Sequence, residues 1–470
     1  MPSAQIPIIK GDAIANSLET DYRDSLPVNM YPVIRNIHGA NGYMLCYPGL
    51  SSFATGEGID RGGNYNDRFG EHYRVSGDKF ISVGQTGVVS VLGTVPGTGQ
   101  ASMPYSFNTQ AIIAGGRAFL YSPSGGFTEI TDSDLGTPID CAWINGYYFF
   151  TDGEYIYHTD IGDETSIDPL QYATAEFMPD KSLGVMKTQD NKMIVFGRYS
   201  IEYFVDVAQD DFAFQRLEAR SQKIGIVATY AKCELDRVYI VGGRKYESVA
   251  VHAIGVGSSE KISTREIDKI IAEYTEPELS DIRMECRTEN DISFILVHLP
   301  NETLCFNVNA AKSIGIGYAW SILKSDISGN EPYRGINGIF DPRISKWLYG
   351  DKRLSNIGYL DNNSCTYYGD AVEWILTTPF VNLDGYSIDE IELETIPGHT
   401  TTEDAKVAFS MSYDGLTYGR EYWIKYGDPN DYDQKFIVRS AGYVNDWVSM
   451  RFRGASKSRM SFAMMRIDYA

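Results

Sequence analysis

The chain has 470 residues, enough for two or three domains, and it is rich in Gly (45), Tyr (33) and Phe (21). Its formal net charge is −21, from 41 Lys and Arg against 62 Asp and Glu, which argues against tight non-specific binding to DNA or anionic membranes. No segment approaches the roughly 18 apolar residues of a membrane helix. The N-terminus also lacks the basic start and long apolar run of a signal peptide.

The first 64 residues are irregular and interrupted by proline. They contain the stretches Leu26-Pro27-Val28-Asn29-Met30 and Tyr47-Pro48-Gly49-Leu50. Each proline fixes its own φ and removes a backbone donor, which disfavours a helix. We therefore expect residues 1–64 to form an N-terminal extended arm, and Leu26 to Met30 are candidates for contacts with a neighbouring molecule.

A loose repeat follows from about residue 65. Each copy has an apolar run, a glycine, a short polar spacer and a second apolar or aromatic run, which is typical of a β-hairpin tip. The glycines are Gly77, Gly116, Gly146, Gly197, Gly243 and Gly350, with a glycine-free copy around Asn301. Their mean spacing of about 45 residues is close to one four-stranded propeller blade. We predict a β-propeller of six or seven blades over residues 65–370; a set of unrelated β-sandwiches is the alternative.

One amphipathic helix is expected inside this region, near residues 264–274. Ser263-Thr264-Arg265-Glu266 has the pattern of a capping box. Ile267, Ile270, Ile271 and Tyr274 then follow at helical spacing and give one apolar face. The pattern favours a helix packed on the side of the propeller over one that binds a partner.

After residue 371 the pattern changes to regular alternation. In Trp447–Arg453 one face carries Val448, Met450 and Phe452, and the other carries Trp447, Ser449, Arg451 and Arg453. Such alternation indicates a half-buried antiparallel strand. We predict a separate C-terminal β-sandwich over residues 371–470, so the fold class is all-β.

The stretch M-S-Y-D-G-L-T-Y-G-R-E, Met411 to Glu421, raises the question of a glycan-cleaving enzyme. Ser412, Asp414, Gly415, Thr417 and Tyr418 resemble the Asp-box of sialidase propellers, S-x-D-x-G-x-T-W, but are one residue too short. A second partial match, Ser122 to Thr128, has Ser in place of Asp. Asp-Gly between alternating strands is also a strong hairpin signal, so we expect a turn that positions Arg420 and Glu421.

Other chemical motifs are weak. The histidines at positions 38, 72, 158, 252, 298 and 399 are scattered and form no metal-binding spacing. The adjacent acids Asp210-Asp211 and Glu403-Asp404 lie in polar stretches typical of solvated loops, and no phosphate-binding loop or nucleophile elbow is present. The six cysteines are widely spaced and are interpreted as buried free thiols. We predict no catalytic residues, no cofactor and no metal.

A basic cluster lies near the C-terminus, at Arg451, Arg453, Lys457 and Arg459. It could dock onto an acidic neighbour, including another copy of this chain, or it could be an ordinary charged rim of a strand. These four residues complete the set of candidate interface residues.

The chain resembles the packaged-DNA stabilisation proteins, or tail accessory factors, of short-tailed bacteriophages of the lambdoid Salmonella-phage type. Short anchors carry the resemblance in order along the chain: Leu26 to Met30, Tyr47 to Leu50, Ile201-Glu202-Tyr203-Phe204, Lys269-Ile270-Ile271, Tyr274-Thr275, His298-Leu299-Pro300, Tyr333-Arg334-Gly335, Thr378-Pro379-Phe380, Asp414-Gly415 and Tyr418 to Glu421. Between these anchors the sequence diverges.

The resemblance implies a non-enzymatic virion part, assembled in the host cytoplasm and located in the tail. Six copies would form a ring below the portal and its adaptor, extend the DNA channel and help to retain packaged DNA. The ring would also hold a needle or plug protein and support tailspikes or fibres, while DNA passes without specific binding. Two other functions remain open from the residues: a glycan-binding or glycan-hydrolysing propeller, and a cytoplasmic scaffold propeller.

Overall fold

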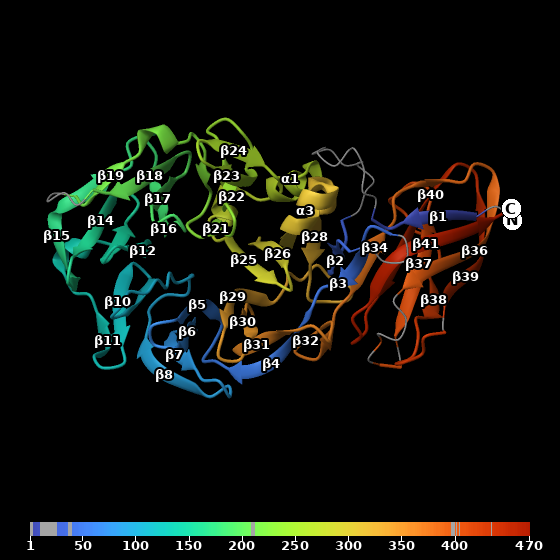
Figure 1. Ribbon diagram of the computed structural model, residues 1–470, viewed down its shortest axis with the longest axis horizontal. Helices are drawn as coiled ribbons and strands as arrows, with labels where there is room; N and C mark the ends of the chain where they lie inside the picture. The colour runs from blue at the N-terminus through green and yellow to red at the C-terminus, as the bar shows by residue number, and fades with distance from the viewer. Residues whose placement is uncertain are drawn as a thin grey trace.

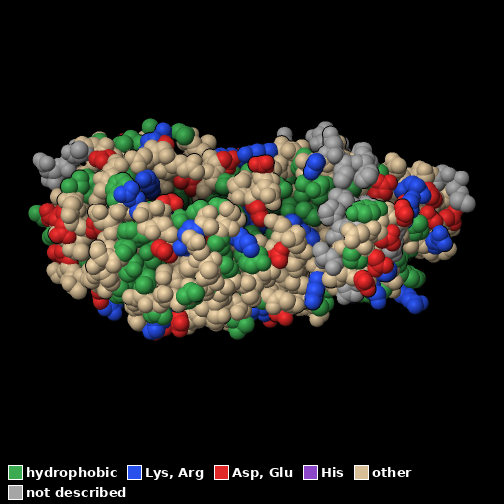
Figure 2. Space-filling model, turned by 60° about the horizontal axis from the view of Figure 1, so that its bottom comes forward, with side chains coloured by type: hydrophobic (Ala, Val, Ile, Leu, Met, Phe, Trp, Pro, Cys, Tyr) green, Lys and Arg blue, Asp and Glu red, His purple; other side chains and the backbone are tan. Residues whose placement is uncertain are grey.

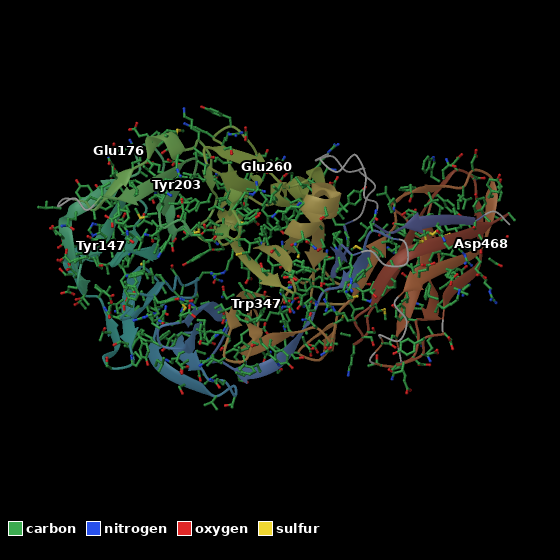
Figure 3. All side chains as sticks on the ribbon, in the orientation of Figure 1. Tyr147, Glu176, Tyr203, Glu260, Trp347 and Asp468 are labelled. Atoms are coloured by element: carbon green, nitrogen blue, oxygen red, sulfur yellow. The ribbon has the colours of Figure 1, made fainter. Side chains whose placement is uncertain are left out.

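The protein has two parts arranged side by side along its long axis (Figure 1). The computed structural model describes residues 3–9, 26–35, 40–207, 212–395, 400, 402–403, 405–433 and 435–470. A ring of small antiparallel sheets forms the larger part, and a pair of facing sheets at one end holds both chain termini. Tyr147 in the ring and Asp468 in the paired sheets mark opposite ends of the molecule (Figure 3).

Seven sheets surround the centre of the ring and form the blades of a β-propeller. Blades 1 to 4 comprise β5 (Asp60–Asn66), β6 (Glu71–Ser76), β7 (Lys79–Val83) and β8 (Val89–Thr94); β9 (Gln110–Ala114), β10 (Arg117–Ser122) and β11 (Gly126–Glu129); β12 (Asp140–Ile144), β13 (Tyr147–Thr151), β14 (Tyr155–Asp160) and β15 (Asp163–Thr174); and β16 (Ser182–Lys187), β17 (Met193–Gly197), β18 (Ile201–Asp206) and β19 (Phe214–Arg216). The blade count agrees with the predicted six or seven.

Blades 5 to 7 continue the circle. They comprise β20 (Gly225–Ile226), β21 (Lys232–Glu234), β22 (Val238–Gly243), β23 (Ala250–Gly255) and β24 (Ser258–Lys261); β25 (Arg283–Glu289), β26 (Ile292–His298), β27 (Thr303–Asn307) and β28 (Trp320–Leu323); and β29 (Gly335–Asp341), β30 (Lys346–Asp351), β31 (Asn356–Asp361), β4 (Gly49–Thr55), β32 (Thr366–Tyr367) and β33 (Asp370–Ala371). Each predicted repeat turn, including the glycine-free turn around Asn301, lies between two consecutive strands of one blade.

Blade 7 joins the two ends of the propeller. Its fourth strand, β4, comes from the N-terminal region and pairs antiparallel with β31, with Leu50 opposite Leu360. Phe53 and Ala54 of β4 then pack with Ile357 of β31 and with Ile81 and Val83 of blade 1. One strand from near the start of the chain therefore closes the ring by hydrogen bonding to the last blade and packing against the first.

The C-terminal part is a β-sandwich. One sheet contains β1 (Ser3–Pro7), β2 (Met30–Val33), β3 (Tyr43–Cys46), β36 (Tyr386–Thr395), β39 (Phe436–Val444) and β41 (Ser461–Tyr469), and the other contains β34 (Trp374–Thr377), β35 (Val381–Asn382), β37 (Lys406–Ser412), β38 (Tyr422–Lys425) and β40 (Trp447–Gly454). On β40 the predicted inner residues Val448, Met450 and Phe452 are all fully buried.

The first 64 residues differ from the extended arm that we expected. Strands β1, β2 and β3 belong to one sandwich sheet, where β1 and β3 both pair with β41. Strand β4 completes blade 7, and β5 crosses the expected boundary between residues 64 and 65. Proline does not prevent these pairings: Pro32 lies in the short strand β2, opposite Met44. The described part of the arm is therefore distributed between the two domains.

In the part of the chain that the structure describes, three short α-helices lie beside the sheets: α1 (Arg265–Ala272), α2 (Glu276–Leu279) and α3 (Val308–Ile314). Three 3-10 turns in the same part occupy Ser133–Leu135, Glu218–Arg220 and Ile316–Tyr318. Helix α1 agrees with the predicted helix and buries Ile267 and Ile271. Its cap differs from the prediction, because the hydroxyl of Ser263 donates to Asp268 (2.6 Å) and accepts from the backbone of Val251. A capping box does form at α2, between Thr275 and Glu278.

One of the apolar clusters of the protein extends from the propeller into the sandwich. It includes Ile240 and Trp320 of the propeller together with Trp374, Phe452 and Met465 of the sandwich. This shared cluster favours a fixed arrangement of the two parts. Separating them would expose apolar surface to water, at a free-energy cost of about 25 cal/mol for each Å² exposed. Among the described residues, none of the helices is long and apolar enough to cross a membrane.

Candidate functional site at the domain junction

The predicted interface residues Leu26 to Met30 lie between the propeller and the sandwich of this same chain. The backbone of Val28 exchanges two hydrogen bonds with Ile375 of β34, at 2.9 and 3.0 Å. On its other side the segment bonds to Ile322 of β28, which donates to Pro27 and accepts from Asn29. This segment is thus a connecting strand between a propeller blade and a sandwich sheet.

Asn29 is the most constrained residue of the junction. Its φ of 50° is left-handed, a conformation that Asn tolerates better than most residues. Its Nδ2 donates to the backbone oxygens of Lys324 (2.9 Å) and Glu373 (2.7 Å), and its Oδ1 accepts from the Lys324 amide (3.0 Å). With only 3 % of its surface exposed, the side chain holds the propeller and the sandwich together from inside.

A row of alternating charges crosses the same junction. Lys324 Nζ lies 2.7 Å from Glu373, and Glu373 lies 2.7 Å from Arg453. Arg453 in turn makes a bidentate contact with Glu421, at 2.5 and 2.6 Å. Hydrogen bonding from Arg453 lowers the pKa of Glu421, and hydrogen bonding from Glu421 raises that of Arg453. Glu373 is buried, so the row is partly protected from solvent screening.

The predicted basic cluster is mostly engaged within the chain. The guanidinium of Arg451 stacks 4.0 Å from the Tyr418 ring centre and approaches Glu421 at 3.5 Å. Arg459 donates to the Cys46 carbonyl and to the Tyr31 hydroxyl, both at 2.7 Å. Only Lys457 of the four has an exposed side chain. Docking of this cluster onto a neighbour stays a prediction, with Lys457 as the accessible residue.

The Asp-box-like stretch forms a turn between β37 and β38. Asp414 Oδ1 accepts from the amides of Leu416 and Thr417, both at 2.8 Å, and Asp414 Oδ2 accepts from the Thr417 hydroxyl at 2.6 Å. These bonds lower the pKa of Asp414 because they favour its charged form. The turn carries the chain toward Glu421, which pairs with Arg453 as described above. As predicted, the stretch is a structural turn.

The other residues considered for chemistry have structural surroundings. His72, His158, His252 and His298 are buried, and burial lowers the pKa of each. All six cysteines are free, five of them buried and Cys286 half-buried. Within the described ranges, no group of three or more His, Cys, Asp or Glu could hold a metal ion. His38, His399, Asp404 and the pair Asp210-Asp211 lie outside the described residues.

The sequence alone did not predict that Lys324, Glu373 and Glu421 form ion pairs at the junction. Glu373 lies just after the predicted boundary at residues 370 and 371, and Lys324 lies inside the predicted propeller, so nothing in the sequence links the two charges. Their partners come from segments 49 and 80 residues away. No local pattern marks a charge that will be buried by such a distant segment.

The fold and the junction together define a class of protein: a closed β-propeller fixed rigidly to a β-sandwich. The chain belongs to the family of bacteriophage P22 Gp10. The beta-propeller model of that family matches residues 4–365, and its beta-sandwich model matches residues 373–470. The chain is also similar to the tail hub protein gp10 of Salmonella phage P22, with 28 % identity over 497 aligned positions that cover 99 % of both chains.

Solved structures give more distant likenesses. A streptogramin B lyase structure covers 67 % of this chain and 97 % of its own, with 13 % identity and a TM-score of 0.43. The WD40 domain of Neurospora crassa Pan2 covers 65 % of this chain and 90 % of its own, with 7 % identity and a TM-score of 0.40. No functional conclusion follows from likenesses at this level.

Proposed function

We propose that this protein is the tail hub of a short-tailed phage virion, where it acts as a structural part without enzymatic activity. The observation that carries the proposal is the similarity to the P22 tail hub protein, which extends over 99 % of both chains and so includes the propeller, the junction and the sandwich. The rigid junction supports the same role, because a platform that holds other proteins needs a fixed spacing between its two parts.

The finer arrangement is part of this proposal. Six copies form a ring below the portal and its adaptor ring, extend the DNA channel, and carry a needle or plug and tailspikes or fibres. The net charge of −21 supports a conduit through which DNA passes without being held, since negative walls repel the phosphate backbone. On the face shown in Figure 2, acidic side chains are spread over both parts, with Lys and Arg between them.

Electron microscopy of purified tail complexes tests the proposal, with a small tag on this chain to locate and count its copies. We expect six copies in an axial ring below the portal and adaptor. Peripheral density, or absence of the chain from particles, would contradict the hub role. A glycan-active propeller would then be the first alternative to test, by assaying hydrolysis of host polysaccharide.

A further inference from the structure

The propeller axis contains a cavity that the hub role does not use. Its volume is about 630 Å³, within the usual range for ligand sites, and it is lined by the innermost segments of blades 1 to 6. Four of its lining residues are cationic (Arg68, Lys187, Lys232 and Arg283), whereas its only acidic one is Asp140. This excess of positive charge is unusual in a chain whose net charge is −21.

Arg283 and Tyr230, which both line the cavity, contact each other and Gln100. Arg283 donates to the Gln100 side chain at 3.1 Å and lies 5.3 Å from the Tyr230 ring centre, while the Tyr230 hydroxyl donates to the Gln100 backbone at 3.3 Å. Arg283 also lines a second cavity of about 420 Å³, so this residue is shared between the two cavities.

The acidic residue of the pocket is already neutralised. Asp140 Oδ2 lies 2.7 Å from Lys232 Nζ and accepts from the Val185 amide at 3.0 Å, and both charged side chains are more than 90 % buried. Arg68 and Lys187 have exposed side chains, whereas the charge of Arg283 already acts on the nearby carboxylates of Asp60 and Glu285. Arg68 and Lys187 are therefore the two cations of the pocket that are most available to a ligand.

The polar groups that lack a partner in this pocket are donors. The Nε of Arg283 and the indole Nε1 of Trp143 are buried, and neither makes a hydrogen bond to any described residue. Leaving a buried donor unpaired is unfavourable, so a ligand that supplies an acceptor at these positions is favoured. The complementary ligand is therefore rich in acceptors and negatively charged.

The mouth of the pocket alternates cations with aromatic rings. Arg68 lies 5.0 Å from the ring centre of Phe107, Phe107 packs edge-to-face on Trp143 at 5.0 Å, and Lys187 lies 5.3 Å from the Trp143 ring. Phe107 remains 60 % exposed, so its ring presents a free apolar face beside two charges. Such a wall suits a ligand that carries an apolar group next to its anion.

We propose that this axial pocket, defined by Arg68, Phe107, Trp143, Lys187 and Arg283, binds an acidic peptide segment of a partner protein that presents carboxylates beside an apolar or aromatic side chain. A DNA duplex does not fit, because the cavity of about 630 Å³ has the volume of a small-ligand site. A phosphate ligand is less favoured, because none of the described helices lines the pocket and strand backbones replace the helix N-terminus typical of phosphate sites.

A titration of the purified full-length chain tests the site, using a fluorescent random copolymer of glutamate and tyrosine as the probe. The negative net charge of the chain repels such a probe, so saturable binding reports a local cationic site. We expect the double variant Arg68→Gln/Lys187→Gln, and separately Phe107→Ala, to weaken binding at least tenfold. These side chains are exposed, so the variants should fold normally.

Lys245→Gln is the matched control, because Lys245 is an exposed lysine that also lies over an aromatic ring, Tyr246, but is outside the pocket. This variant should bind the probe with the same affinity as the unaltered chain. Absence of saturable binding by the unaltered chain, or an equal loss in the control, would overturn the proposal. If a single-stranded oligothymidylate binds more tightly than the copolymer, the proposal that the ligand is a peptide is wrong. This titration needs no virion, so its failure is distinguishable from failure of the hub role in particles.

Discussion

Asn29 shows how one residue can hold two domains in place. It combines a left-handed backbone with three hydrogen bonds, one buried and two partly buried, to segments 295 and 344 residues away. Few side chains can do both, because the backbone geometry excludes most residues and the bonds require one donor group and one acceptor of an amide. The sequence singled out the segment Leu26 to Met30 without indicating that its contacts lie inside the chain.

We predict that Asn29→Ala lowers the free energy of unfolding by about 2–4 kcal/mol, because it leaves buried backbone groups of Lys324 and Glu373 without a partner. The urea midpoint of the full-length chain measures this change. Asn430→Ala is the matched control, since Asn430 is exposed and has a similar φ of 63°. If Asn29→Ala lowers the free energy of unfolding no more than Asn430→Ala does, the left-handed backbone and not the hydrogen bonding explains why Asn occupies position 29.

Buried histidines make the stability of the protein sensitive to acid. Burial, with help from the nearby Arg244 charge, lowers the pKa of His252 to about 4. Burial and the Lys352 charge lower the pKa of His298 to about 4, against the opposing effect of the Glu285 carboxylate in contact with its ring. In the unfolded chain both would titrate near 6.5. Between pH 6.5 and 4 the unfolded state therefore binds more protons than the folded state, and stability falls as the pH is lowered through this window.

We expect His252→Gln to flatten this pH dependence, because the variant has no proton to take up at this position on unfolding. The urea midpoints of both proteins should be compared at several pH values from 7 to 4. The difference in urea midpoint between the two proteins should narrow as the pH falls, because only the unaltered chain loses the contribution of His252 to stability. Parallel curves would mean that His252 titrates alike in the folded and unfolded states.

At the scale of elements, glycine is needed at the repeat positions for two different physical reasons. Gly116 and Gly146 occupy left-handed positions in tight turns, with φ of 73° and 99°. Gly350 lies inside β30, where an added Cβ would collide with the Asp60 side chain of blade 1. The sequence pattern predicted a hairpin turn at every one of these glycines, and the hairpins are present. It did not predict that Gly350 is needed because two blades approach closely there.

Local patterns therefore predicted hairpins, the helix near 264–274 and the inner face of β40. They did not predict which strand closes the propeller, because a strand at Gly49–Thr55 has no local feature that identifies β31 as its partner about 300 residues later. The same limit explains why the arm at residues 1–64 was expected to be extended. Its strands have their partners in distant segments, and only the folded structure shows them.

The pairing of β4 with β31 predicts how fragments of the propeller behave. A fragment of residues 65–370, the boundary expected from the sequence, lacks β4 and most of β5, so both the edge of blade 7 and the faces of Ile81 and Ile357 would be exposed. We expect it to lose cooperative thermal unfolding. A fragment of residues 48–371 retains both strands and serves as the matched comparison. Equal melting of the two would show that closure by β4 is dispensable.

For the whole molecule, the basic cluster separates into residues that hold the fold and one that faces solvent. We predict that Arg453→Glu lowers the free energy of unfolding by about 2–4 kcal/mol, because it places a third carboxylate beside Glu373 and Glu421. Lys457→Glu should leave the unfolding midpoint unchanged and reduce incorporation of the chain into particles, measured by quantitative blotting of purified tails. Normal incorporation of the Lys457 variant would remove this cluster from the predicted interface.

The pairing of the two chain ends in one sheet has a consequence for synthesis. Ile6 lies opposite Met465, so nearly all of the sequence between them must be synthesised before β1 has its partner. At about 5–20 residues per second, that delay is roughly 20–90 s. Until Ser461–Tyr469 has been made, β1 and β3 have no β41 to pair with, so their sandwich sheet cannot be completed. This sheet therefore closes only after every strand of the propeller has been synthesised.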